Sequence, residues 1–243
     1  MALIYGRNPV VEALRAGNEV DKIYVAAGIG EVPVIEEIKR RARAARVPIQ
    51  QIDRRALDRM TDGGGHQGVG AEVADFGYVT LDDLLARAGE ANEPPLLLLL
   101  DSIQDPHNLG ALMRTAEAVG AHGVVIPKHR AAGITPTVVK ASAGAAEYLP
   151  VAQVTNLARA IDDLKKQGVW IAGLDAAGTK AYDEVDWKGP MAIVVGAEGA
   201  GLGRIIAERC DFLVRLPMRG HVDSLNAAVA GSIVLYHAWR KRG

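Results

Sequence analysis

From residue 96 onward, the chain contains short, uninterrupted apolar runs that alternate with stretches of helical spacing. A strand that is apolar along its whole length is buried on both faces, which is typical of a parallel sheet covered by helices on both sides. The runs predict strands at Leu96–Leu100, Gly123–Pro127, Val169–Leu174, Met191–Val195 and Phe212–Leu216. Helical spacing predicts helices at Asn108–Val119, Thr135–Ala141, Asn156–Gln167 and Leu225–Arg240. We therefore expect residues 96–243 to form an α/β domain around a mostly parallel sheet.

Residues 1–74 show the same alternation on a smaller scale. Short strands are predicted at residues 22–26, 49–52 and 69–74, and helices at residues 8–15, 32–46 and 54–60. This pattern predicts a separate, small α/β domain. The segment 75–95 contains one short predicted helix at 81–88 and ends in Glu-Ala-Asn-Glu-Pro-Pro. We expect it to be the linker between the two domains.

Basic residues are concentrated in the smaller domain, although the net charge of the whole chain is only −1. Between Lys39 and Arg59 the basic side chains far outnumber the acidic ones, which are Asp53 and Asp58. Such a local surplus can contact the phosphates of RNA even when the chain as a whole is nearly neutral. The alternative is a solvated helix face without a ligand.

Several function classes are disfavoured by what the sequence lacks. The single cysteine, Cys210, excludes an internal disulfide and a cysteine metal cluster, and is typical of a protein of the reducing cytoplasm. The histidines show no metal-ligand spacing, so we expect no metal site. No signal peptide is visible, and the longest apolar run, Leu96–Leu100, is far too short to span a membrane. The chain has no G-x-S-x-G or Walker segment, which disfavours hydrolase and NTPase functions.

Three loops that follow predicted strands are rich in small and polar residues, and doubly wound sheets bind ligands at such strand ends. The first, residues 101–110, leads into a helix predicted to start near Asn108. Free N–H groups at that helix start could bind an anion, with Arg114 reaching back to it. The alternative is a capped helix that carries a surface arginine.

The other two loops come later in the chain. The second, residues 194–203, is rich in glycine, but Arg204 stands where the dinucleotide pattern G-x-G-x-x-G requires glycine, so an NAD-binding oxidoreductase is disfavoured. The third, residues 216–226, precedes the last predicted helix. We expect Ser224 to cap that helix and Asn226, in its first turn, to face the loop.

Taken together, the three loops resemble the signature motifs of the SpoU family of RNA ribose methyltransferases, part of the SPOUT superfamily. The matching residues are Asn108, Gly110, Arg114, Thr115, Gly196, Glu198, Gly199, Gly201, Leu202, Leu216, Pro217, Met218, Gly220, Ser224, Leu225 and Asn226. The segment Tyr5–Leu14 and the sequence His-Gln-Gly-Val at 66–69 are similar to the N-terminal module of bacterial 23S rRNA guanosine-2'-O-methyltransferases. The resemblance thus covers essentially the whole chain.

The resemblance implies a fold and an assembly that the strand pattern does not reveal. A SpoU catalytic domain carries a deep trefoil knot, an exception to the rule that chains are not knotted. The smaller domain would be an L30e/L7Ae-like module that binds RNA. The family also implies a homodimer formed through the catalytic domains, transfer of a methyl group from S-adenosylmethionine, and 23S rRNA as the partner.

The resemblance also assigns roles to residues. Residues implied to bind the cofactor are Leu174, Gly196, Glu198, Leu216, Met218, Ser224 and Leu225. Residues implied to act in catalysis are Arg114, Asn108, Glu198, Ser224 and Asn226. Residues expected to contact RNA are Arg7, Lys39, Arg40, Arg43, His66 and Gln67. An arginine has too high a pKa to act readily as a base, so we expect Arg114 to hold the target phosphate and to stabilise the developing alkoxide.

Other functions stay open at this point. The target could be a tRNA or another rRNA nucleotide instead of a guanosine of 23S rRNA. The chain could also be an RNA-binding protein whose catalytic domain is inactive, in which case it would not bind S-adenosylmethionine.

Overall fold

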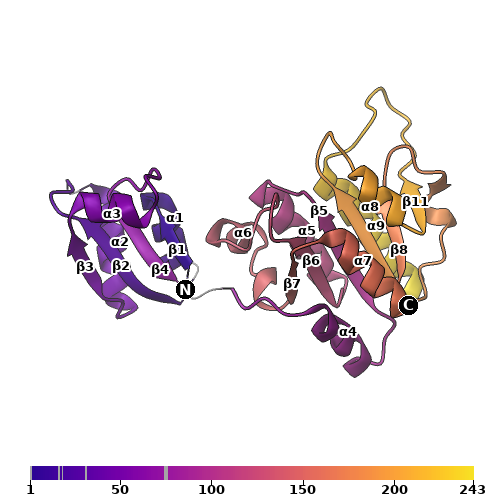
Figure 1. Ribbon diagram of the computed structural model, residues 1–243, viewed down its shortest axis with the longest axis horizontal. Helices are drawn as coiled ribbons and strands as arrows, with labels where there is room; N and C mark the ends of the chain where they lie inside the picture. Colours follow the sequence, from indigo (N-terminus) through magenta and orange to yellow (C-terminus); the bar gives the residue numbers. More distant parts are fainter. Residues whose placement is uncertain (1, 16, 18, 31, 74–75) are drawn as a thin grey trace. The chain divides into compact units, whose positions relative to one another are not determined.

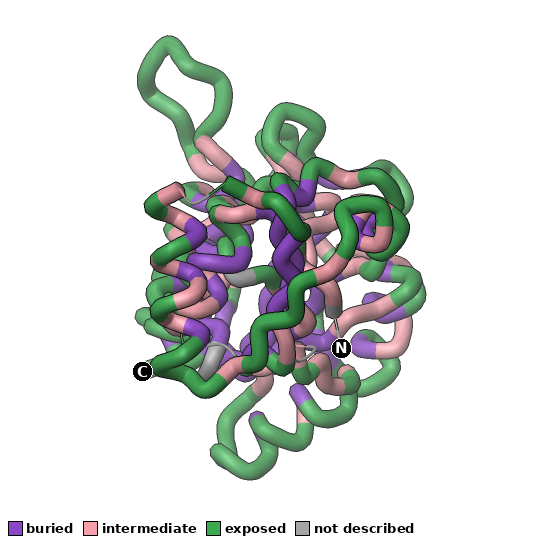
Figure 2. The backbone as a smooth tube through the Cα atoms, turned by 90° about the vertical axis from the view of Figure 1, so that its left-hand side faces the viewer, coloured by how far each residue is buried: buried purple, intermediate pink, exposed green. Residues whose placement is uncertain are grey.

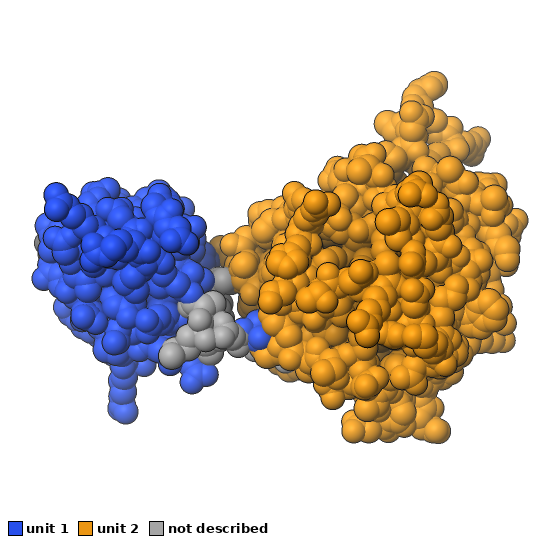
Figure 3. Space-filling view, viewed as in Figure 1, with its two compact units in different colours: residues 1–76 blue, residues 77–243 orange. Residues whose placement is uncertain are grey.

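The computed structural model describes residues 2–15, 17, 19–30, 32–73 and 76–243. These residues form two compact units, Met1–Phe76 and Gly77–Gly243 (Figure 3). Buried stretches of backbone lie in the interior, and exposed stretches lie in the outer loops (Figure 2). Each unit has a core of its own and is described separately below.

The first unit is a four-stranded sheet with helices on both faces (Figure 1). Its strands, in the spatial order β1-β4-β2-β3, are Ala2–Tyr5, Val69–Val73, Val20–Ala26 and Ile49–Ile52. Its helices are α1 (Arg7–Arg15), α2 (Pro33–Ala44) and α3 (Arg54–Met60). Val10 of α1 and Ile38 of α2 are buried in the same cluster as Ile23 of β2, so α1 and α2 share one face of the sheet. Leu57 of α3 packs with Tyr24 of β2 on the other face. The predicted α/β character of this segment is confirmed, and β1 is an additional strand.

The second unit contains a seven-stranded sheet in which neighbouring strands run parallel throughout. The spatial order is β7-β6-β5-β10-β8-β11-β9. In that order, the strands are Val151–Val154, Gly123–Pro127, Leu96–Asp101, Met191–Gly196, Trp170–Leu174, Phe212–Arg215 and Lys180–Ala181. Every residue of β5 and of β10 is buried, which agrees with their continuous apolar sequence. The predicted parallel sheet is confirmed, whereas β7 and β9 did not stand out in the sequence.

Helices cover both faces of this sheet. They are α4 (Leu81–Glu90), α5 (Pro106–Ala118), α6 (Pro136–Ala141), α7 (Leu157–Lys166), α8 (Arg204–Arg209) and α9 (Ala227–Arg242), with single 3-10 turns at Ala145–Glu147 and Tyr182–Glu184. Leu84 of α4, Ile161 of α7 and Ile206 of α8 share one core cluster with the strands. On the other face, Gly231 of α9 packs closely against Val195 of β10 and Leu112 of α5. No described helix is long and apolar enough to cross a membrane.

The predicted linker 75–95 is wrong for most of its length. Residues from Gly77 onward belong to the second unit, and Val79 pairs with Ala152 beside β7. Helix α4 is fixed at its start by a capping box between Thr80 and Asp83, and its Leu84 is fully buried in the core. The polar sequence at 90–95 suggested a linker, but the apolar face of α4 determines where the segment packs.

Two helix starts also differ from the prediction. Helix α5 begins at Pro106 and not near Asn108, because the carboxylate of Asp105 accepts hydrogen bonds from the N–H groups of His107 and Asn108. Helix α9 begins at Ala227, and its capping residue is Asn226 and not Ser224. Both differences change which backbone N–H groups and side chains are free at the site described below.

Candidate functional site

The site lies at the carboxyl edge of the second sheet, where the ends of parallel strands meet. Strands β5, β10, β8 and β11 are neighbours in the sheet, although they are far apart in the sequence. The loops that follow them therefore converge. The three loops singled out in the sequence, 101–110, 194–203 and 216–226, all belong to this group.

A cavity of about 280 Å³ opens between the loops that follow β10, β8 and β11. All seven residues predicted to bind a cofactor line it: Leu174, Gly196, Glu198, Leu216, Met218, Ser224 and Leu225. The structure adds Asp175 and Asp223, which were not predicted as binding residues. Asp175 directly follows β8, so its strand-end position is the signal that could have identified it. Within the described residues, no group of three or more histidine, cysteine, aspartate or glutamate side chains is arranged to hold a metal.

The glycine loop that forms one wall of the cavity is tightly folded. A Cβ on Gly196 would collide with the backbone of Gly201, so only glycine fits at this strand end. Gly199 and Gly201 have φ angles of 77° and 66°, which glycine adopts without strain. The loop is anchored by the buried Asp101 at the end of β5, whose Oδ2 accepts a 2.7 Å hydrogen bond from the N–H of Gly203. Backbone therefore approaches the cavity closely on this side.

Three polar side chains meet where this cavity borders a second one. The side-chain nitrogen of Asn226 donates to Asn108 Oδ1 at 3.0 Å and to Glu198 Oε2 at 3.1 Å. The side-chain nitrogen of Asn108 donates to the same Glu198 oxygen at 3.3 Å. Each residue comes from a different motif loop, so the structure brings three of the five predicted catalytic residues into direct contact. Ser224, the fourth, lines the cavity.

The second cavity is a groove of about 1090 Å³ along α5 and α9. Arg114, the fifth predicted catalytic residue, lines it together with Asn108 and Asn226. The exposed Arg114 makes no side-chain hydrogen bond or ion pair with any residue that the structure describes. Its guanidinium is therefore available to an anion in the groove. Tyr182, Tyr236 and Arg240 also line the groove, and only tertiary structure could have associated them with it.

The prediction that Arg114 reaches back to an anion at the helix start is wrong. Because α5 begins at Pro106, Arg114 lies about 12 Å along the helix from its first residue. The N–H groups of His107 and Asn108 at that end already donate to Asp105. An anion that Arg114 binds in the groove therefore cannot rely on these two N–H groups, although His107 and Asn108 also line the groove.

The residues predicted to contact RNA in the first unit separate into two groups. Arg7 and Gln67 line a cavity of about 390 Å³, together with Arg54 and the backbone at Gly28. The Nε of Arg7 donates to the backbone oxygen of Gln67, which ties the two residues together.

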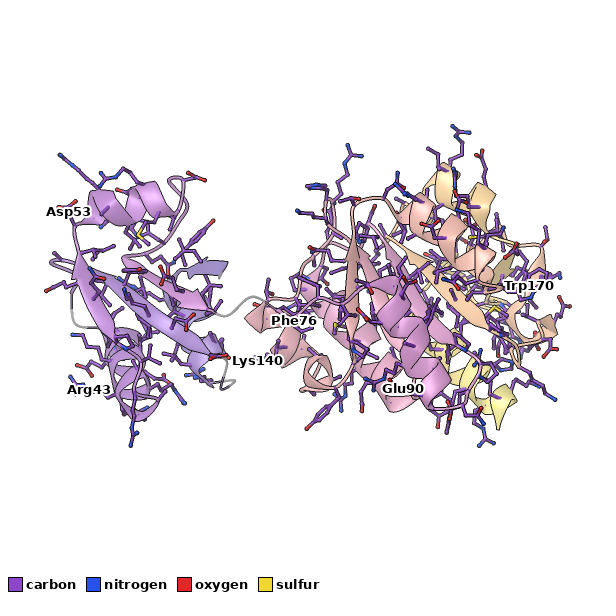
Figure 4. All side chains as sticks on the ribbon, turned by 60° about the horizontal axis from the view of Figure 1, so that its bottom comes forward. Arg43, Asp53, Phe76, Glu90, Lys140 and Trp170 are labelled. Carbon is purple, nitrogen blue, oxygen red and sulfur yellow. The ribbon has the colours of Figure 1, made fainter. Side chains whose placement is uncertain are left out.

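Lys39, Arg40 and Arg43 form the second group, on α2. Figure 4 shows Arg43 and Asp53, the residue before Arg54, at opposite ends of this unit. The two groups therefore do not form one continuous basic patch.

His66 belongs to neither group. It is only 3% exposed, its Nε2 lies 2.7 Å from Asp58 Oδ1, and its Nδ1 accepts from the N–H of Gly68. We therefore correct its assignment to a residue that shapes the loop.

Two family models match the chain. Residues 95–236 match the SpoU rRNA methylase family, and residues 3–79 match a family described as an RNA 2'-O ribose methyltransferase substrate-binding domain. The chain belongs to the SpoU rRNA methylase family. The two matches fall on the two compact units, although the SpoU match begins only after α4. It contains every residue of the cavity and, except for His237 and Arg240, every residue of the groove.

Relatives and solved structures agree with this membership. A Bacillus subtilis (strain 168) protein assigned to the TrmH family of tRNA/rRNA methyltransferases is 47% identical over 241 residues, covering 98% of this SpoU chain and 95% of the relative. The SpoU methyltransferase AviRb from Streptomyces viridochromogenes, in complex with AdoMet, is 27% identical with a TM-score of 0.65, covering 99% and 90% of the two chains. An AdoMet-bound rRNA methyltransferase from Sinorhizobium meliloti is 26% identical with a TM-score of 0.61, covering 98% and 86%.

Proposed function

We propose that this chain transfers a methyl group from S-adenosylmethionine to a ribose 2'-hydroxyl of RNA. One observation carries the proposal: a small-molecule cavity and a groove that contains an unpaired arginine border one another at Asn108, Glu198 and Asn226. A methyl donor in the cavity and a ribose in the groove would then meet at that border. Two AdoMet-bound structures among the solved relatives support the choice of cofactor.

The cavity fits S-adenosylmethionine in size and in chemistry. Its volume of about 280 Å³ is near the lower end of the range of about 300–1,000 Å³ for small-molecule sites. Leu174, Leu216 and Leu225 offer apolar surface to an adenine ring, and the tight backbone around Gly196 offers polar groups to its edge. Asp175, Asp223 and Glu198 bring carboxylates to a ligand that carries positive charge.

The protein must hold the two reactants in line and manage the charge that develops on the ribose oxygen. When bound, the cofactor would supply a methyl group on a sulfonium sulfur that departs as a neutral thioether, while the ribose hydroxyl loses its proton to solvent. Asn226 and Asn108 fix the position of Glu198 at the border between cavity and groove. Arg114 holds a phosphate next to the target ribose and stabilises the developing alkoxide.

The role of Arg114 gives a direct test of the function. In Arg114→Ala, we expect methyl transfer to RNA to fall by at least about 100-fold, the loss typical of removing one transition-state donor. The dissociation constant for S-adenosylmethionine, measured by calorimetry, should not change because Arg114 does not line that cavity. Arg114→Lys keeps the charge without the planar fork and should recover part of the activity. Near-normal turnover by Arg114→Ala would disprove this role.

We further propose that the substrate is a guanosine of 23S rRNA and that the first unit selects it. The family model of residues 3–79 is one of substrate binding, and the Arg7–Arg54 cavity lies in that segment. A ribosomal substrate would place the protein in the cytoplasm. A tRNA target remains the alternative because the relatives' family includes tRNA enzymes. Mapping ribose methylation in rRNA and tRNA from cells with and without the gene distinguishes the two.

We also propose that the second unit is knotted and dimeric. Strand β11 lies between β8 and β9, so the segment joining those two strands crosses its end. The crossing is close, because a Cβ on Gly178 would meet the backbone of Val214 and Arg215. In addition, α9 exposes Val229, Ile233, Tyr236 and Trp239, each at least 39% accessible, at spacings that share one helix face. An apolar stripe of this kind suits the interface of a homodimer. Because Val229, Ile233 and Tyr236 also line the groove, a partner subunit on this stripe would form part of the groove's wall.

A further inference from the structure

The chain has an uninterrupted acid-free segment that begins in α5 and continues past α6. No aspartate or glutamate occurs between Glu117 and Glu147, whereas the segment contains Lys128, Arg130 and Lys140. Its surface therefore carries a positive charge that the net charge of −1 for the chain conceals. Lys128, His129 and Arg130 are consecutive, and all three are exposed. We call residues 128–130 the basic loop.

The basic loop sits at the same edge of the sheet as the proposed active site. It directly follows β6, whose parallel neighbour β5 ends in Asp101, the anchor of the glycine loop. The carboxyl ends of parallel neighbours lie at one edge, so the basic loop is beside the loop that leads into α5 and Arg114. It then leads into α6 (Figure 1). Ala141 of α6 lines the groove.

The backbone holds the basic loop at both ends. The N–H of Lys128 donates to the oxygen of Val154 at 2.8 Å, and the N–H of Ala132 donates to the oxygen of Ile103 at 2.8 Å. Between these two bonds, Arg130 has a φ of 58°, which an arginine adopts only where the surrounding structure imposes it. The three side chains therefore project from a fixed turn.

No protein group in the described ranges uses these charges. The side chains of Lys128, His129 and Arg130 make no hydrogen bond or ion pair there. Asp105, a carboxylate of the neighbouring loop, accepts hydrogen bonds from the start of α5. A fixed, unpaired basic turn beside an RNA groove matches the chemistry of a phosphate contact.

We propose that the basic loop binds the phosphate backbone of the substrate RNA beside the target nucleotide, independently of base sequence. This inference rests on the proposed RNA substrate but not on methyl transfer. It assigns RNA contacts to the catalytic unit in addition to those expected in the first unit. Its role is to orient the strand along the groove, and the cofactor cavity is unaffected.

The test measures RNA binding by the full-length protein without the cofactor, using in vitro transcribed 23S rRNA in a salt titration. In the double variant Lys128→Ala/Arg130→Ala, we expect the dissociation constant to rise roughly fivefold to tenfold. The slope of log K against log salt should become shallower by about 0.7 for each phosphate that the variant no longer binds. Lys128→Arg/Arg130→Lys should bind like the unmodified protein, because phosphate binding requires charge and not one particular side chain.

The matched control is Lys166→Ala/Lys188→Ala, which removes two basic side chains at the opposite edge of the same sheet. The proposal is overturned if the Lys128/Arg130 double variant has the same affinity and salt slope as this control. It is also overturned if the unmodified protein does not bind 23S rRNA. A protein that binds the RNA through the basic loop yet transfers no methyl group would disprove the proposed activity and leave this inference standing. Unchanged S-adenosylmethionine binding in each variant verifies that the domain is folded.

Discussion

The side-chain amide of Asn226 contributes both to a helix start and to the candidate site. Its oxygen accepts hydrogen bonds from the N–H groups of Ala228 and Val229, which caps α9. Its nitrogen donates to Asn108 and Glu198, which joins the motif loops. The position of the helix start and the geometry at the border of the two cavities therefore depend on one group.

These two roles can be separated by substitution. Asn226→Ala removes both, and we expect it to lower the unfolding free energy by about 1 kcal/mol through loss of the cap. Asn226→Asp keeps a capping oxygen but places a second carboxylate against Glu198, so stability should fall less while turnover falls at least tenfold in both variants. Thermal denaturation and a methyl-transfer assay measure the two effects. Full activity in Asn226→Asp would show that the nitrogen is dispensable.

At the level of residues, the convergence of the motif loops was predictable from the sequence, whereas the exact helix starts were not. The motif residues converge as the resemblance implied, because motifs at strand ends must meet in a parallel sheet. The capping residue of α9 was not predictable in the same way, since Asp223, Ser224 and Asn226 are all good capping residues. Of these three residues, Asn226 is the one that caps α9, and its side chain also contacts Glu198 in a distant loop. His66 was assigned to RNA because burial cannot be read from a polar loop sequence.

Helices α5 and α6 pack together at Gly110, a residue of the first motif. A Cβ at this position would lie 2.8 Å from the carbonyl carbon of Ala141 and 2.9 Å from the nitrogen of Ser142. Both atoms belong to the backbone, so the clash can be relieved only if α6 moves. Because Ala141 lines the groove, such a movement would also reshape the proposed RNA site.

We therefore expect Gly110→Ala to destabilise the protein, although alanine favours helix formation. Helix propensity contributes about 0.5–1 kcal/mol in favour of alanine, whereas overpacking costs about 1–3 kcal/mol, so the net loss is up to about 2.5 kcal/mol. Gly89→Ala in α4 is the control, since a Cβ there meets nothing within 4 Å, and it should gain about 0.5–1 kcal/mol. Denaturant titration measures both changes. Equal responses at the two positions would refute the packing argument.

At the level of elements, the long apolar and strongly periodic segments were predicted, and the elements that were missed are all short. The strands β5 and β10 are apolar up to their last residues, Asp101 and Gly196, and were identified. In contrast, β1, β7 and α8 contain only four to six residues and carry too few apolar positions to define a period. Helix α4 was recognised as a helix but assigned to a linker, because its polar C-terminal tail resembles one.

The two units have separate cores, which predicts how the molecule can be divided. Residues 77–243 should fold alone and bind S-adenosylmethionine with an unchanged dissociation constant, while losing affinity for 23S rRNA. Residues 96–243, cut at the boundary first predicted from sequence, lack α4 and expose the core that Leu84 and Ala88 cover. We expect this shorter fragment to be insoluble or to unfold at a much lower temperature. Calorimetry and thermal denaturation compare the two fragments, and equal stability would contradict the assignment of α4 to the catalytic unit.

The order of strands in the second sheet has a consequence for biosynthesis. Strand β10 pairs with both β5 and β8 in the middle of the sheet. Leu96 of β5 therefore cannot pair with Met191 of β10 until β10 has been synthesised. During translation, the apolar β5 leaves the ribosome long before the strand that completes its burial, whereas the first unit can fold as soon as β4 emerges. Pairings this distant in sequence slow folding and leave apolar segments exposed in the meantime. A nascent chain of this protein should therefore be a client of chaperones through most of the synthesis of its catalytic unit.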